Sequence, residues 1–127
     1  MDTLASALNA IKTSEERGET RARIRPASRL VKQVLLILQA EKYVGDFEFV
    51  DDGKSGEFSV SLVGKVNDLR VIKPRFSVKL GEWEKFEERF LPARDVGIII
   101  SSTPKGILTH KQAKKKGLGG RLLCYVY

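Results

Sequence analysis

The chain has 127 residues, of which 42% are hydrophobic, and its formal net charge is +7. This length allows one domain or two small lobes, and the composition is that of a globular protein. The single Cys and single His exclude an internal disulfide and a zinc site, and no apolar run approaches the roughly 20 residues that a bilayer requires. We therefore expect a protein that holds no metal or cofactor and does not enter a membrane.

The N-terminal third predicts two helices around one strand. Leu4, Leu8 and Ile11 share one helical face, which Asp2 or Thr3 can cap and Gly18 can end. The first residues lack the basic and apolar regions of a secretory signal, so we expect a cytoplasmic protein. Residues 21–25 alternate arginines with apolar residues and indicate a short strand. Ser28 then precedes a second helix with a broad apolar face.

The next segment predicts a hairpin and then a boundary. Residues 47–49 and 58–62 alternate apolar and polar side chains on either side of a turn-rich stretch, residues 51–56. Between Gly64 and Pro74, Asn67 and Asp68 interrupt any long element. We expect an N-terminal lobe of residues 1–66, with two helices and an antiparallel sheet, and a C-terminal lobe of residues 67–127.

The C-terminal lobe is predicted to be mostly β, with short helices, which makes the whole chain an α+β protein. A strand is expected at residues 76–80, and an acidic helix carries Trp83, Phe86 and Phe90 on one face, where core packing is favoured over base stacking. Residues 96–100 read as a buried strand that ends in a loop of Ser and Thr. Thr109 and Gln112 form a capping-box pattern for a helix over residues 110–116, with Gly117 as its C-cap, and a last strand spans residues 122–127.

Positive charge is segregated along the sequence. No Asp or Glu follows Lys105, and none lies between Thr20 and Ala40, where four arginines and one lysine occur. Such segregation favours a polyanionic partner over a merely solvated surface. Short hydroxyl side chains and glycines at the end of a firm strand suit the wide, shallow minor groove of RNA, where ribose hydroxyls and base edges are accessible.

Several motifs carry a family resemblance. The run Ser102-Thr103-Pro104-Lys105-Gly106 and the run from Gly117 to Tyr127 resemble the C-terminal signature of the eighth small-subunit ribosomal protein family. The resemblance extends along the chain through Pro26-Ala27-Ser28-Arg29-Leu30 and Ile72-Lys73-Pro74-Arg75-Phe76. The run from Arg89 to Arg94 resembles the archaeal and eukaryotic branch, and we favour the archaeal one.

The resemblance implies a non-enzymatic protein of the ribosome. Such a protein binds an internal loop in the central domain of the small-subunit RNA, supports assembly, contacts neighbouring small-subunit proteins and is a monomer in isolation. An alternative is an RNA-binding repressor of its own message. The RNA-binding residues implied for the C-terminal lobe are Ser102, Thr103, Lys105, Gly106, Gly119, Gly120 and Arg121, with Lys114 and Lys115 from the basic helix. Arg29, Lys32 and Lys54 are implied for the N-terminal lobe.

Pro104 and Arg121 are among the positions that depart from the family pattern. Pro104 stands where the family commonly has a serine, which removes one hydroxyl and one amide donor from the loop. Arg121 replaces a bacterial Glu and would add a phosphate contact.

Competing functions have weaker sequence support. Gly53-Lys54-Ser55 resembles the end of a P-loop, but Glu48 stands where the first glycine is needed and a strand is predicted to follow. Cys124 and His110 could form a catalytic dyad, although Cys124 lies in an apolar strand and is expected to be a core thiol. The helix bearing Lys114–Lys116 lacks the apolar face that membrane insertion requires.

Overall fold

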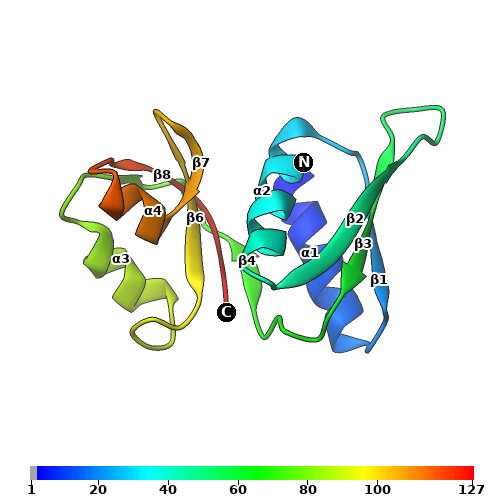
Figure 1. Cartoon of the computed structure of the whole chain (residues 1–127), viewed down its shortest axis with the longest axis horizontal. Helices are drawn as coiled ribbons and strands as arrows, with labels where there is room; N and C mark the ends of the chain where they lie inside the picture. The colour runs from blue at the N-terminus through cyan, green and yellow to red at the C-terminus, as the bar shows by residue number, and fades with distance from the viewer. Residues whose placement is uncertain (1–2) are drawn as a thin grey trace. The chain divides into compact units, whose positions relative to one another are not determined.

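The structure, a computed structural model, describes residues 3–127 and confirms the α+β class. The chain forms two compact units, one ending at Leu69 and the other spanning Arg70–Tyr127, called unit 1 and unit 2 below (Figure 1). No helix within residues 3–127 is both long and apolar enough to cross a membrane. The elements are α1 (Thr3–Glu16), β1 (Arg21–Ile24), α2 (Arg29–Ala40), β2 (Val44–Val50), β3 (Glu57–Leu62), β4 (Leu69–Val71), β5 (Ser77–Val78), α3 (Trp83–Phe90), β6 (Ile98–Thr103), β7 (Gly106–Thr109), α4 (His110–Lys115) and β8 (Gly120–Val126).

The two helices of unit 1 follow the sequence pattern. Along α1 the residues expected on one face are buried, and Gly18 follows the helix with φ +70°, a conformation that favours glycine. Thr3 is itself helical, whereas the cap predicted at Asp2 lies outside the described residues. Ser28 caps α2, because its side-chain oxygen accepts a hydrogen bond of 3.2 Å from the Val31 amide.

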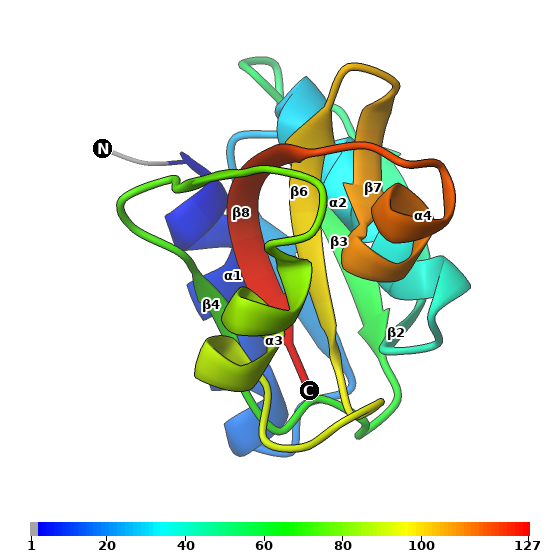
Figure 2. The ribbon, with the colours of Figure 1, turned by 90° about the vertical axis from the view of Figure 1, so that its left-hand side faces the viewer.

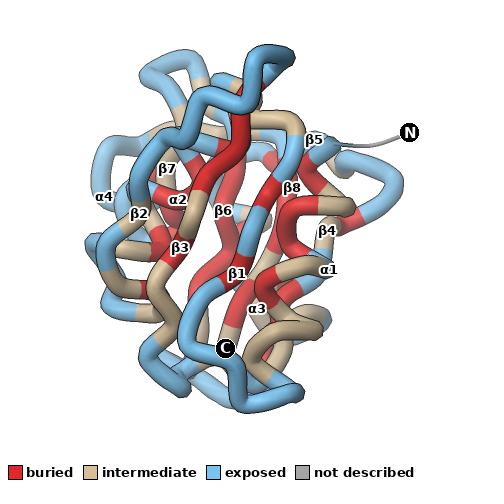
Figure 3. Tube along the Cα trace, turned by 90° about the vertical axis from the view of Figure 1, so that its right-hand side faces the viewer, coloured by how far each residue is buried: buried red, intermediate tan, exposed pale blue. Residues whose placement is uncertain are grey.

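The sheet of unit 1 is antiparallel, with strand order β1-β3-β2. Phe58 and Val60 on β3 pair with Phe49 and Phe47 on β2, which confirms the predicted hairpin. Exposed and buried residues alternate along β1, where the arginines are exposed and Ala22 and Ile24 are buried (Figure 3). The amphipathic sheet therefore buries one face and leaves its cations in water.

In unit 2, β8 lies beside β6, with β7 beyond β6 and both β4 and β5 on the other edge of β8. Helices α3 and α4 cover one face of this sheet (Figure 2). Trp83 and Phe86 pack there with Ile99, Ala113 and Leu122, so the predicted core role of these two aromatics is confirmed. The Trp83 indole N–H donates to the Leu118 carbonyl at 3.0 Å, which satisfies its polar atom. Phe90 is only partly buried.

Four strands of unit 2 differ from expectation. The predicted strand at 76–80 shortens to β5 because the chain turns, with the Glu82 amide bonded to the Lys79 carbonyl at 2.9 Å and Leu80 exposed. The buried strand begins at Ile98 rather than Val96, since Gly97 adopts φ +84°. β4 and β7, of three and four residues, were not predicted. Such short segments give little periodicity to read.

Helix α4 begins as predicted. The Thr109 side chain accepts from the Gln112 amide and the Gln112 side chain accepts from the Thr109 amide, which completes the capping box. The helix ends at Lys115, one residue earlier than predicted, and Gly117 follows with φ +69°.

The buried His110 ties α4 to β6 and to α3. Its Nδ1 accepts a hydrogen bond from the Ile99 amide at 3.0 Å, and its Nε2 lies 3.0 Å from Oε1 of Glu87. Because Nδ1 accepts, the proton of the neutral ring resides on Nε2, facing the carboxylate. Burial lowers the pKa of His110 despite the opposing effect of Glu87.

This lowered pKa predicts a pH-dependent loss of stability. Below about pH 6.5, the ordinary pKa of histidine, the unfolded chain takes up a proton that folded His110 resists. The free energy of unfolding should therefore fall between pH 7 and pH 5, by at most about 1.4 kcal/mol per pH unit from this residue. His110→Asn keeps an acceptor for the Ile99 amide but does not titrate. Denaturant unfolding of this variant should lack that part of the pH dependence, and identical pH profiles for the two proteins would contradict the prediction.

Candidate nucleic-acid interface

The hydroxyl residues after the three isoleucines lie in a strand and not in the predicted loop. β6 continues through Ser101, Ser102 and Thr103, and Gly106 already begins β7. Ser101 is fully buried, and its Oγ donates to the Leu108 carbonyl at 3.4 Å. Ser102 is exposed and Thr103 is partly exposed. The sequence patterns did not predict β7, and they therefore did not predict the hairpin that holds these hydroxyls in place.

Pro104 and Lys105 form the turn between β6 and β7. A turn accepts proline at its first central position, since the fixed φ of the ring matches the backbone there. The Thr103 hydroxyl donates to the Gly106 carbonyl at 2.8 Å and accepts from the Lys105 amide at 3.2 Å. Gly106 adopts φ +108°. The Thr103 hydroxyl thus stabilises the turn and retains one lone pair for a further donor.

Four side chains form a row across one end of the unit 2 sheet. Ser102 pairs with Arg121 on β8 and with Ile107 on β7, and Arg121 pairs in turn with Ser77 on β5. Directly paired residues point to the same face of a sheet, so these side chains share one face. Arg121, Ser102 and Ser77 are exposed and Ile107 is partly exposed. Ser102 and Arg121 were predicted as site residues from the sequence, but Ser77 and Ile107 were not. The register between strands, which makes these residues neighbours, cannot be deduced from a single sequence.

Gly119 and Gly120 provide close packing at the start of β8. A Cβ on Gly119 would collide with the Val78 carbonyl oxygen, and one on Gly120 would lie 2.7 Å from the Ser102 carbonyl oxygen and 3.1 Å from Thr103 Cγ2. The two carbonyl contacts involve backbone that cannot move freely. These glycines therefore have a structural role in bringing β5, β6 and β8 together, whether or not RNA also approaches them.

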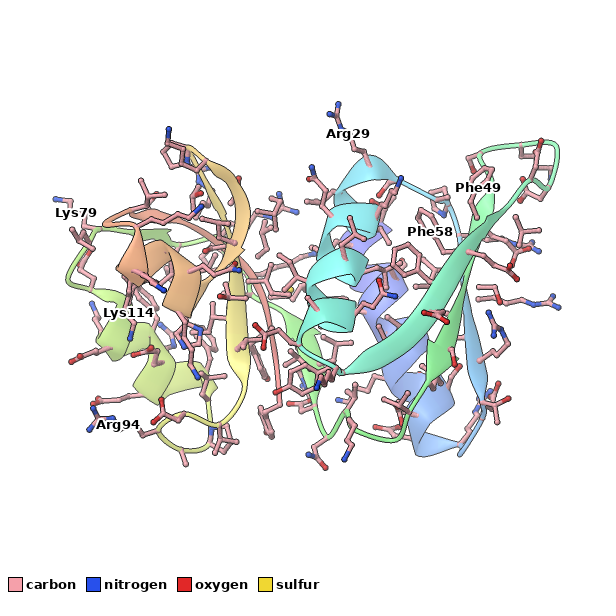
Figure 4. All side chains as sticks on the ribbon, viewed as in Figure 1. Arg29, Phe49, Phe58, Lys79, Arg94 and Lys114 are labelled. Carbon is pink, nitrogen blue, oxygen red and sulfur yellow. The ribbon has the colours of Figure 1, made fainter. Side chains whose placement is uncertain are left out.

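The predicted lysines of α4 do not join this row. Ser102 and Arg121 lie on the sheet face opposite α3 and α4, since neighbouring Ser101 and Leu122 pair on the helix-covered face. Lys114 points toward α3, where its Nζ lies 2.7 Å from Oε1 of Glu87 (Figure 4). Lys115 is exposed in the last helical turn. Of these two lysines, Lys115 is the better placed to meet a phosphate.

The basic residues implied for unit 1 gather at one end of that unit. The Ala27 amide donates to the Gly56 carbonyl at 3.0 Å, which joins the start of α2 to the β2–β3 turn. Arg29 and Lys32 lie in the first turn of α2 and Lys54 lies in the β2–β3 turn, and all three are exposed.

The competing chemistries lack a matching geometry. Gly53-Lys54-Ser55 forms the tip of a β-hairpin and leads into β3, not into a helix as a P-loop requires. Burial raises the pKa of the Cys124 thiol to about 12, so it is protonated and unreactive at neutral pH. His110 bonds to Ile99 and faces Glu87, as described above. Among residues 3–127, no group of three His, Cys, Asp or Glu side chains could hold a metal ion.

The packing of Gly120 yields a stability test. Gly120→Ala should lower the free energy of unfolding by about 1–3 kcal/mol, because the added methyl group forces the backbone of β6 and β8 apart. Ser102→Ala, on the adjacent strand, removes an exposed hydroxyl and should change the free energy of unfolding by less than about 0.5 kcal/mol. Denaturant unfolding of both variants checks the prediction, and an undiminished stability of Gly120→Ala would show that β8 has room for a side chain.

Comparison with known families identifies the family of this chain. The sequence model of the family described as Ribosomal protein S8 matches residues 2–127, nearly the whole chain. The chain therefore belongs to the ribosomal protein S8 family, whose members are small-subunit ribosomal proteins that bind ribosomal RNA.

Proposed function

We propose that this protein binds an internal loop in a helix of the central domain of small-subunit RNA, chiefly through unit 2. The observation that carries the proposal is the row formed by Ser77, Arg121, Ser102 and Ile107 beside the Thr103–Gly106 turn. Arg121 can bind a phosphate, while the short hydroxyls can meet ribose and base edges in the shallow minor groove. Unit 1 adds phosphate contacts through Arg29, Lys32 and Lys54.

The protein acts by organising RNA and not by catalysis. Binding holds the strands of the internal loop in one arrangement, onto which neighbouring small-subunit proteins assemble. Outside the ribosome the protein is a cytoplasmic monomer. The run from Arg89 to Arg94, together with Arg121, supports placement in the archaeal branch of the family.

Salt dependence provides the first test. Binding to a central-domain fragment should weaken steeply as salt rises, because each phosphate contact releases counterions. A duplex of the same length without the internal loop should bind more weakly throughout and reach background first, because it lacks the groove contacts. Filter binding or fluorescence anisotropy between about 50 and 200 mM salt measures both RNAs. Equal affinities throughout this range would refute specific recognition.

The second test separates positioning from specificity. Ser102→Ala should weaken binding to the central-domain fragment by about 1 kcal/mol and leave binding to the duplex without the internal loop unchanged. Arg121→Ala should weaken both RNAs alike and reduce the slope of affinity against salt by about 1. Both positions are exposed, so thermal melting should show intact folds. If Ser102→Ala affected the two RNAs equally, the row across the sheet would not contribute to specific recognition of the RNA.

A further inference from the structure

Phe49, on β2 just before the β2–β3 turn, exposes 60% of its surface. Burying a phenylalanine side chain stabilises a protein by about 1.5–3 kcal/mol, so an exposed ring at a fixed position calls for a partner. We propose that Phe49 is a stacking platform for an unpaired base of the RNA that this protein binds. The inference rests on the proposed function and adds to it a base contact in unit 1, where only phosphate contacts were expected.

The Phe49 ring has an aromatic neighbour on its inner side. Its centroid lies 6.2 Å from that of Phe58, at an interplanar angle of 71°, and Phe58 is itself buried and in edge contact with Phe47. Gly56 leaves the space beside the ring, because a Cβ at that position would collide with Phe49. A ring packed on one side and open to solvent on the other is suited to stacking, since part of its side-chain freedom is already lost before binding.

Cations lie at the same end of unit 1. The bond from the Ala27 amide to the Gly56 carbonyl sets the start of α2 next to the backbone that the Phe49 ring covers. Arg29 projects from the beginning of α2, and Phe49 and Phe58 lie on the neighbouring hairpin (Figure 4). Lys32 on α2 and Lys54 in the hairpin turn add two more exposed positive charges.

The acids in this turn are directed at its own backbone. Asp51 accepts a hydrogen bond of 2.9 Å from the Gly53 amide, and Asp52 accepts two of 2.9 Å from the amides of Lys54 and Gly56. The Glu57 carboxylate lies 3.0 Å from Arg25. These carboxylates therefore organise the turn, while the cations remain available to a ligand.

An exposed aromatic ring at the same end of the unit as three exposed cations fits RNA better than an apolar protein surface. Single-stranded nucleic acid is bound by positive charges that follow the phosphates and by aromatic rings on which bases stack. The apolar core of a protein interface is instead depleted of charge. The occupant that suits both the ring and the nearby cations is thus a nucleotide with its base turned out of the helix.

Three variants test the proposal against small-subunit RNA. Phe49→Leu keeps an apolar side chain but cannot stack, and it should weaken binding by roughly 5- to 150-fold. Leu36→Ala is the matched control, because it removes another exposed apolar side chain of unit 1, 48% exposed on α2, and it should leave affinity unchanged. Phe49→Trp preserves stacking, and RNA should quench the fluorescence of the new indole. The parent protein supplies the baseline, since its only Trp, Trp83, is buried.

Chemical probing of the RNA bases completes the experiment. The parent should protect one unpaired base that Phe49→Leu leaves reactive. The stacking site would be overturned if Phe49→Leu showed unchanged affinity and an unchanged probing pattern, and if RNA did not quench Phe49→Trp. In that case, specific binding by the parent protein would still support the proposed function. If Phe49→Leu bound RNA normally but was poorly incorporated into assembled subunits, the stacking site would also be overturned, and Phe49 would instead contact a neighbouring protein. If the parent bound small-subunit RNA no better than an unrelated duplex, the proposed function would fail together with this inference.

Discussion

The close passage of three backbones at the start of β8 is the constraint on which the candidate interface depends. β8 enters the sheet at Gly119 and Gly120, where its backbone lies against Val78 on one side and Ser102 on the other. Larger residues would push β5 and β6 away, and the row that these strands carry would spread. Because neighbouring strands are spaced by their hydrogen bonds, the positions of Ser102 and Arg121 follow directly from this contact. Two residues without side chains thus determine where the neighbouring side chains stand.

Helix α3 shows how an acidic segment can coexist with a basic protein that binds RNA. On one side of the helix, Glu87 lies within 3.0 Å of both His110 and Lys114, so its charge is engaged within unit 2. On another side, Arg89 lies 5.0 Å from the ring centroid of Phe76 and 5.2 Å from that of Phe90. Cation–aromatic contacts of this kind stabilise a partly exposed ring. The acids of α3 therefore lie on the helix-covered side of the sheet, opposite the proposed interface.

Sequence patterns predicted elements that are long or have strong local signals. The Ser28 cap, the capping box of α4 and the Phe47–Leu62 hairpin could be read because capping and alternation are local properties of the chain. The strand β7 could not, since Gly106–Thr109 is too short to show a period and follows a turn that resembles a loop. The row in unit 2 escaped detection for another reason. Ser77 and Arg121 are far apart in sequence, and only strand register makes them neighbours.

The proline in the β6–β7 turn has a consequence for how the complex forms. Pro104 fixes one backbone angle of the turn, and Thr103 closes the turn with two hydrogen bonds. A segment already ordered in the free protein docks without a disorder-to-order transition, so binding at this point should carry little of the heat-capacity change that accompanies coupled folding. In the proposed complex, the conformational adjustment then falls on the nucleic acid, which must adapt its shape to an already ordered protein edge.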